Sequence, residues 1–124
     1  KGRSGPVEAY RLAERFPQNA LILSHWGGGL PFYELMPEVR RALEKVYYDT
    51  AASLYLYEDQ VFDLVSRWAP TKVLFGTDYP LIAQGRFLRR VRQAGLDDIG
   101  LGRVLGGNLL AMLHLSNADV NGGN

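Results

Sequence analysis

The stretch Val73-Leu74-Phe75-Gly76-Thr77-Asp78-Tyr79-Pro80 decides how the chain is interpreted. Three apolar residues lead into a glycine, and a carboxylate follows just before a turn that ends in proline. This is the pattern of a short buried strand with an acidic residue at its carboxyl end. Leu21–His25 and Val46–Thr50 repeat the pattern, and each ends in polar side chains. Because parallel β/α folds place chemistry at the carboxyl ends of strands, the pattern singles out His25 and Asp78.

The segments around the three predicted strands have the periodicity of amphipathic helices. Apolar residues recur at i, i+3, i+4 and i+7 between residues 9 and 16 and between residues 61 and 68. Further helices are expected over residues 36–43, around 87–91, from 97 or 98 to 104, and over 109–115, with Asn108 as the N-cap of the last. Loops are expected at Gly27–Pro31 and, less clearly, at Ala51–Tyr57, where an extension of the strand is the alternative.

The order of elements predicts an α/β fold with a parallel sheet. Consecutive strands end at intervals close to the roughly 30 residues of a βα unit, which favours right-handed crossovers between neighbouring strands. A closed (β/α)₈ barrel takes about 250 residues, and this sequence has 124. The chain is therefore either a small open sheet or the C-terminal portion of a barrel. A half barrel would expose strand edges, so we expect it to form a homo-oligomer or to need a complementing N-terminal half.

Composition excludes several classes of protein. A hydrophobic content of 47% is ordinary for a globular domain, and the net charge of +1 implies no general attraction to nucleic acid or to membranes. No apolar run approaches the roughly 20 residues that span a bilayer. The absence of cysteine excludes disulfides, thiolate metal sites and thiol nucleophiles, and it fits a cytoplasmic location. We expect one partial domain over residues 1–115 and a flexible tail over residues 116–124.

Each candidate site residue has a functional and a structural interpretation. His25 is either an acid/base or metal-site residue, or a histidine satisfied by a backbone partner at a strand end. Asp78 either binds a divalent metal or caps the turn that follows it. For Asp49 and Thr50, structural hydrogen bonding is favoured over catalysis. For His114, in the predicted last helix, a solvated position or one at the edge of the core is favoured.

Three further features are weaker signals. The glycines Gly27–Gly29 allow close approach of an anionic ligand, but their spacing matches neither common phosphate-binding motif. The arginines of residues 86–92 are most simply the solvated side of a helix, with anion binding as the alternative. Four aromatic residues either line a pocket for a planar substrate or pack in the interior: Trp26, Phe32, Tyr33 and Tyr79.

The motifs His-Trp-Gly-Gly-Gly-Leu-Pro-Phe (25–32) and Gly-Thr-Asp-Tyr-Pro (76–80) together resemble one family. The chain is similar to the C-terminal part of amidohydrolase-related proteins, the branch that includes aminocarboxymuconate-semialdehyde decarboxylase. The ending Leu-Gly-Gly-Asn-Leu-Leu (105–110) resembles the closing segment of that family, and the similarity covers residues 6 to about 115.

The resemblance implies strands six to eight of a (β/α)₈ TIM barrel with a divalent metal, usually zinc, at its mouth. It implies that His25 is the acid/base group beside the metal-bound water and that Asp78 is a metal ligand. The histidines of the family's first and fifth strands have no counterpart in this sequence. We therefore expect a fragment of a metal-dependent hydrolase or non-oxidative decarboxylase for a small carboxylated or cyclic substrate, inactive by itself. The alternative is a non-catalytic α/β module that binds an anionic ligand at Gly27–Gly29.

Overall fold

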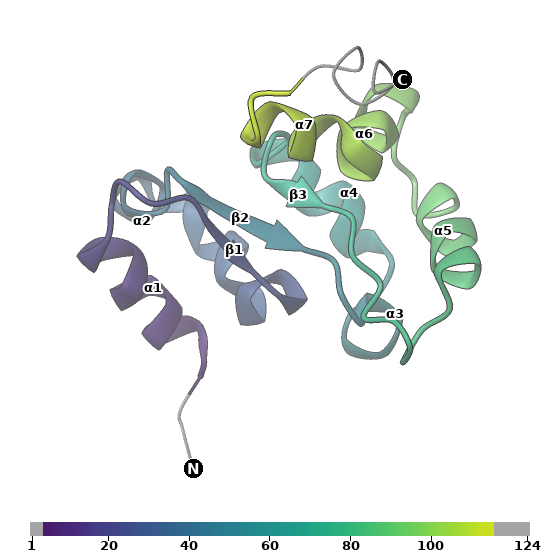
Figure 1. The fold of residues 1–124 in the computed structure, drawn as a ribbon, viewed down its shortest axis with the longest axis horizontal. Coiled ribbons are helices and arrows are strands. Elements are labelled where there is room, and N and C mark those ends of the chain that lie inside the picture. The colour runs from purple at the N-terminus through teal and green to yellow at the C-terminus, as the bar shows by residue number, and fades with distance from the viewer. Residues whose placement is uncertain (1–3, 116–124) are drawn as a thin grey trace.

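Three short parallel strands form one sheet in the computed structural model, which describes residues 4–115. The strands are β1 (Leu21–Leu23), β2 (Val46–Asp49) and β3 (Val73–Leu74). They lie side by side in the order β1-β2-β3 (Figure 1), as the sequence predicts for consecutive βα units. The pairing sets Leu21 opposite Val46 and Tyr48 opposite Val73, so the carboxyl ends of all three strands meet at one edge.

Helices precede, connect and follow the strands. In chain order they are α1 (Pro6–Arg15), the 3₁₀ segment η1 (His25–Leu35), α2 (Pro37–Ala42), α3 (Ser53–Leu56), α4 (Gln60–Trp68), α5 (Gln84–Arg92), α6 (Asp98–Gly102), the π segment η2 (Arg103–Gly107) and α7 (Asn108–Met112). The expected helices near 9–16, 36–43, 61–68 and 87–91 are confirmed as α1, α2, α4 and α5. Asp97 caps α6, since its carboxylate accepts a hydrogen bond from the Gly100 amide at 2.7 Å.

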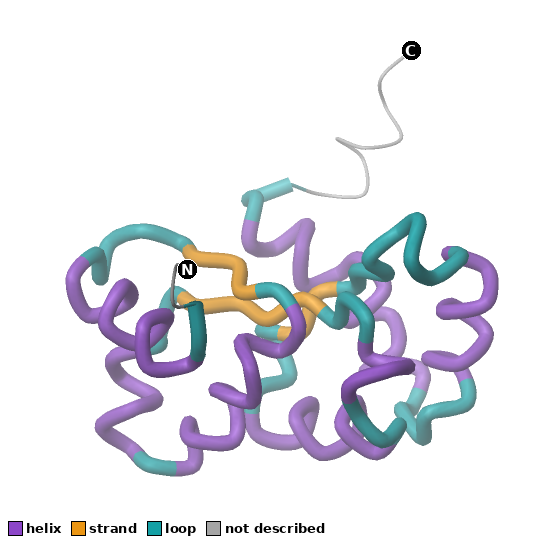
Figure 2. The backbone as a smooth tube through the Cα atoms, turned by 90° about the horizontal axis from the view of Figure 1, so that it is seen from below, coloured by secondary structure: helices purple, strands orange, loops and turns teal. Residues whose placement is uncertain are grey.

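One face of the sheet is covered by most of the helices, and the other face is covered only in part. Figure 2 shows most helices on one side of the strands, while the helix that leads to the C-terminus lies on the other side. Side chains alternate accordingly, with Val46 and Tyr48 buried toward the helices. Ile22 and Tyr47, which are register partners, point to the other face, and Ile22 is 48% exposed. The strands therefore have the apolar alternation of a half-covered sheet within the described residues.

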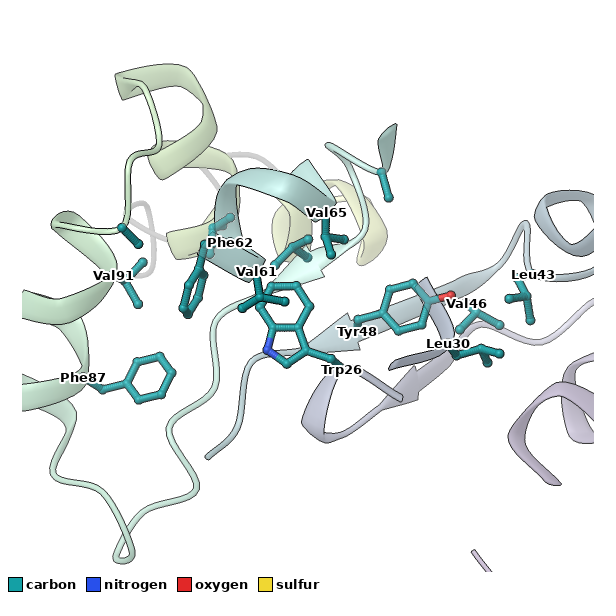
Figure 3. Packing of buried hydrophobic residues seen from close by; sticks show 14 of the residues in the cluster. Trp26, Leu30, Leu43, Val46, Tyr48, Val61, Phe62, Val65, Phe87 and Val91 are labelled. Carbon is teal, nitrogen blue, oxygen red and sulfur yellow. The ribbon is translucent and has the colours of Figure 1, made fainter. Parts of the chain in front are cut away.

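The core fills the space between the sheet and its helices. Trp26 is fully buried and meets the Phe62 ring edge-on at 5.3 Å between centroids. Phe62 in turn contacts Phe87, which links α4 to α5. Figure 3 shows the cluster running from one end of the sheet to the other, through Leu43, Val46, Tyr48, Trp26, Phe62, Phe87 and Val91.

The structure corrects several predicted elements. Gly27–Pro31 lies within η1, but residues 26–29 of that segment have non-helical, left-handed backbone angles, as in a turn. Ala51–Tyr57 contains the short helix α3. The strands are shorter than predicted. In β3 the reason is that the chain beyond Leu74 turns to η2, where the Phe75 amide donates to the Val104 carbonyl at 3.0 Å.

The C-terminal predictions also change. Asn108 does not cap α7; it is the first residue of that helix, and its buried side chain donates instead to the backbone carbonyls of Pro70 and Val73. His114 lies beyond α7 rather than within a helix, and it is exposed. The predicted tail, residues 116–124, lies outside the described residues, so the division at residue 115 stays a prediction. In residues 4–115 no helix has the length and apolar character needed to cross a membrane.

Candidate functional site

The Asp49 carboxylate joins the ends of β1 and β2. One of its oxygens accepts a hydrogen bond from the Ser24 hydroxyl at 2.9 Å. The other accepts from the backbone amides of Ala51 at 2.8 Å and His25 at 3.4 Å. A half-buried carboxylate with several donors is held in one orientation, so Asp49 fixes the backbone around His25. The hydrogen bonds to adjacent segments that the sequence predicts for Asp49 are present.

The His25 side chain is oriented by a single backbone group. Its Nδ1 lies 3.0 Å from the Ala51 carbonyl oxygen. Because a carbonyl only accepts hydrogen bonds, Nδ1 carries the proton in this contact, and in the neutral ring Nε2 keeps its lone pair. His25 therefore does have the backbone partner that the structural interpretation expected. The structure gives Nε2 no partner within residues 4–115, so this nitrogen is available for proton transfer.

His25 opens a left-handed turn that also contains the three glycines. Residues 25–29 all have positive φ, from 54° at His25 to 93° at Gly29. Left-handed geometry is costly for residues that have a Cβ, so the surroundings must hold His25 and Trp26 in place. Trp26 is held by its indole N–H, which donates to the Ser53 hydroxyl at 2.7 Å; that hydroxyl in turn donates to the Thr50 carbonyl at 2.5 Å.

The glycines of this turn are in contact with neighbouring segments. A Cβ on Gly27 would lie 3.2 Å from atoms of both Leu23 and Tyr48, and a Cβ on Gly28 would lie 3.2 Å from the Pro6 ring. The Gly27 amide already donates to the Ser24 carbonyl at 2.9 Å. The first two glycines thus allow close packing of the turn against β1, β2 and α1.

Thr50 ties the end of β2 to the chain beyond β3. Its hydroxyl donates to the Gly76 carbonyl at 2.9 Å and accepts from the Gly76 amide at 3.0 Å. Gly76 also passes close to Asp49, since a Cβ on this glycine would lie 3.4 Å from the Asp49 Cγ. The segment that leads to Asp78 is therefore fixed against the end of β2.

Asp78 follows two residues later, in a left-handed conformation with φ of 64°. Its carboxylate is exposed, and within residues 4–115 the structure gives it no hydrogen-bond partner. The turn after it is closed by backbone contacts, with the Leu81 amide donating to the Asp78 carbonyl at 2.8 Å. The structure thus brings His25 and Asp49 into contact and places Asp78 at the same edge without direct contact to either.

The described residues do not by themselves form a complete metal site. No group of three or more histidine, aspartate or glutamate side chains is close enough together to hold an ion anywhere in residues 4–115. A tight zinc site uses three or four protein ligands. The Asp78 carboxylate and the free His25 nitrogen have suitable chemistry, but they do not satisfy that number.

A cavity of about 360 Å³ lies beside His25. Ser24, His25 and Gly28 line one side of it, and Gly5 and Ala9 at the start of α1 line the other. The volume falls within the range of small-molecule sites. His25 therefore borders space for a ligand.

The aromatic candidates separate into two groups. Trp26 packs in the core, as its structural interpretation predicted. Tyr33 and Tyr79 are 58% and 70% exposed, and Phe32 lies at the surface against the Trp68 ring. Sequence reasoning missed Ser24 and Tyr57. The Tyr57 hydroxyl donates to the His25 carbonyl at 3.5 Å. The position of Ser24 next to His25, at the end of a strand, was a signal that could have found it.

A buried charged cluster anchors the far end of η1. Glu34, which is 1% exposed, accepts hydrogen bonds from Lys72 and from the Tyr48 hydroxyl, the latter at 3.1 Å. Lys72 also donates to the Leu43 carbonyl at 2.7 Å. Burial, with the neighbouring Glu34, raises the pKa of Tyr48. Burial lowers the pKa of Lys72 despite the opposing effect of Glu34. The cluster connects the segment that begins at His25 to β2 and to the start of β3.

Comparison with known proteins identifies the family of this chain. The family model described as Amidohydrolase matches residues 3–115. Among solved structures, the chain is similar to 5-carboxyvanillate decarboxylase LigW from Sphingomonas paucimobilis, with a TM-score of 0.71 and 17% sequence identity. The match covers 89% of this chain and 39% of LigW, so the chain spans well under half the length of that protein. No curated protein matches. Because the family model covers nearly the whole sequence, the chain belongs to the amidohydrolase family.

Proposed function

We propose that this chain is the C-terminal part of the catalytic barrel of a metal-dependent amidohydrolase-family enzyme, a hydrolase or a non-oxidative decarboxylase. The observation that carries the proposal is His25, whose Nδ1 is engaged by the Ala51 carbonyl and which lines a cavity at the carboxyl end of β1. Membership of the family supports the same assignment. In the absence of the missing segments, we expect the chain to be inactive.

His25 is the proposed acid/base residue. When Nε2 takes a proton from water or substrate, the ring becomes cationic, and its Nδ1–H donates more strongly to the Ala51 carbonyl. The same nitrogen then returns the proton to a leaving group in hydrolysis, or to the carbon that loses CO₂ in decarboxylation. Asp49 contributes by holding the His25 and Ala51 backbone in position.

Asp78 is the proposed metal ligand. Its exposed carboxylate at the carboxyl edge of the sheet has the oxygen donors that divalent ions take, and amidohydrolases are generally metal-dependent. We propose zinc, which when bound would supply Lewis-acid activation of water. The remaining ligands would have to come from outside residues 4–115.

The proposed substrate is a small carboxylated or cyclic molecule. LigW acts, by its name, on 5-carboxyvanillate, an aromatic acid. The alternative function, binding of an anionic ligand at Gly27–Gly29, has less support, because Gly27 and Gly28 pack against Leu23, Tyr48 and Pro6.

The test is a chimera in which this chain replaces the corresponding segment of LigW, compared with the chain alone. Three variants are matched by backbone geometry: H25N, D78N and the control H114N all lie at positive φ, which asparagine tolerates. The readouts are metal content by elemental analysis and release of CO₂ from 5-carboxyvanillate.

We expect near-stoichiometric metal in the chimera, lost in D78N and kept in H25N and H114N. We expect turnover to be lost in H25N and D78N and kept in H114N. Retention of both metal and turnover in D78N would refute the ligand role, and turnover by H25N at the rate of H114N would refute the acid/base role. Near-stoichiometric metal and turnover in the chain alone would show that it is not an incomplete site.

A further inference from the structure

The outer face of α5 carries a row of basic side chains. Arg86, Arg89, Arg90 and Gln93 follow one another at i, i+3, i+4 and i+7, so they share one side of the helix. Phe87, on the opposite side, is fully buried. The nine residues of α5 include four arginines and no acidic residue. In a chain with a net charge of +1, this is a local concentration of positive charge.

The row borders a hollow. A cavity of about 350 Å³ is lined by Arg86, Arg89, Arg90 and Gln93, together with Leu54 of α3. Its volume falls in the range of small-molecule sites. The Arg89 side chain folds back along the helix, since its Nη1 would lie 3.8 Å from a Cβ placed on Gly85. This brings the guanidinium of Arg89 toward the first turn of α5, which contains Arg86.

Acidic side chains in residues 4–115 balance only part of this charge. Arg90 pairs with Asp59 at 2.5 Å, and this is the only ion pair that the structure gives to the row within residues 4–115. Arg86 and Arg90 stand at i and i+4, where like charges repel. Arg86 also lies in the first turn, where the helix dipole disfavours a cation. Arg89 and Arg90 lie in the last turn, where the helix dipole favours cations, so Arg86 is the unfavourably placed charge, and a bound anion would relieve its penalty.

We propose that the hollow between α3 and α5 binds a small anion that carries two or more phosphate or carboxylate groups. Arginine guanidinium groups match the oxygens of both groups with paired hydrogen bonds. The Gln93 amide adds a neutral donor, and Leu54 supplies apolar contact for a carbon skeleton. The site shares no residue with the His25–Asp49 contact, so it does not depend on the proposed enzymatic function.

The test is titration of the ¹⁵N-labelled chain with sodium pyrophosphate, followed by NMR at constant ionic strength, with citrate as the carboxylate arm. The expected shifts are largest at Leu54 and across 86–93, and R86Q and R89Q each weaken binding by about tenfold, as expected for loss of a charge-assisted hydrogen bond. The matched control is R92Q, which removes a charge from the same helix without touching the hollow; its affinity stays within about twofold of the parent, since only the general field changes.

Three outcomes would overturn the proposal. One is the absence of saturable shifts at millimolar concentrations of both anions. Another is a loss of affinity in R92Q equal to that in R89Q, which would show general attraction to charge. The third is a set of shifts centred on other elements. Far-UV circular dichroism of each variant checks that the fold is kept. Because Arg86 and Arg89 are both exposed, we expect R86Q and R89Q to fold, and each gives its own measurement of affinity.

Discussion

Replacement of Gly27 by alanine should destabilise the fold much more than the same replacement at Gly29. Both residues have positive φ, 56° and 93°, so both variants place a Cβ in left-handed geometry. That geometry costs about 1–2 kcal/mol, of which about 0.4–1 kcal/mol is offset because alanine restricts the unfolded chain. The expected loss for G29A is therefore about 1 kcal/mol, since its new Cβ would meet only the Tyr57 hydroxyl, at 3.9 Å.

G27A adds a packing conflict. Its Cβ would lie 3.2 Å from Leu23 and 3.2 Å from two ring atoms of the buried Tyr48. Overpacking of an interior costs about 1–3 kcal/mol, which brings the expected total to about 2–4 kcal/mol. The φ of Gly29 is no easier for alanine than that of Gly27, so backbone strain alone cannot produce this order.

Urea unfolding followed by tryptophan fluorescence measures the difference, because Trp26 lies in the same turn. Equal slopes with shifted midpoints would show that the native fold has lost stability. If G27A proves no less stable than G29A, the close packing of the turn against β1 and β2 is not what fixes it, and the argument for its role in orienting His25 fails.

Three further predictions concern the interior. K72M removes the cation that pairs with Glu34, whose side chain is 1% exposed, and should lower the free energy of unfolding by about 3–5 kcal/mol, with E34Q/K72M recovering part of the loss in urea titrations. Burial raises the pKa of Tyr48 above its usual 10.0, so the unfolded chain loses the phenol proton at a lower pH than the folded chain does. The free energy of unfolding should therefore fall as the pH rises above 10.0, by at most about 1.4 kcal/mol per pH unit. In Y48F this fall should be shallower. A steeper fall in Y48F than in the parent would contradict that assignment. N108A removes an amide that donates to two backbone carbonyls, one before β3 and one within it, and should lower the melting temperature through a loss of about 2–3 kcal/mol; an unchanged temperature would show that these bonds are dispensable.

Much of the framework could be predicted because it depends on local pattern. The three apolar runs became adjacent parallel strands, and the helical periodicities became α1, α2, α4 and α5. The hydrogen bonds predicted for Asp49 are present. The prediction of a loop at Gly27–Pro31 did not include the conformation of the turn, because glycine content alone does not reveal that His25 and Trp26 share the same left-handed geometry. That geometry is held by contacts from residues 51–53, which are distant in sequence.

Details that depend on long-range partners could not be predicted. Asn108 has the residue type of an N-cap, yet its amide is used by carbonyls more than 30 residues earlier. The position of the proton on the His25 ring is set by the Ala51 carbonyl, and a backbone contact of this kind cannot be predicted from the pattern of side chains. The roles of His25 and Asp78 stay predictions, because neither residue's chemistry is tested by the fold.

The Thr50 hydroxyl has a consequence for the motions of the sheet. By occupying both the amide and the carbonyl of Gly76, it continues the β2–β3 pairing beyond Leu74, the last residue of β3. The peptide proton of Gly76 should therefore exchange with deuterium as slowly as those inside the strands, although Gly76 belongs to no strand. Valine at position 50 has nearly the same shape but no hydroxyl, so it would free this proton while leaving the interior filled. The segment that leads to Asp78 would then open and close on a faster timescale, with no change in the average fold.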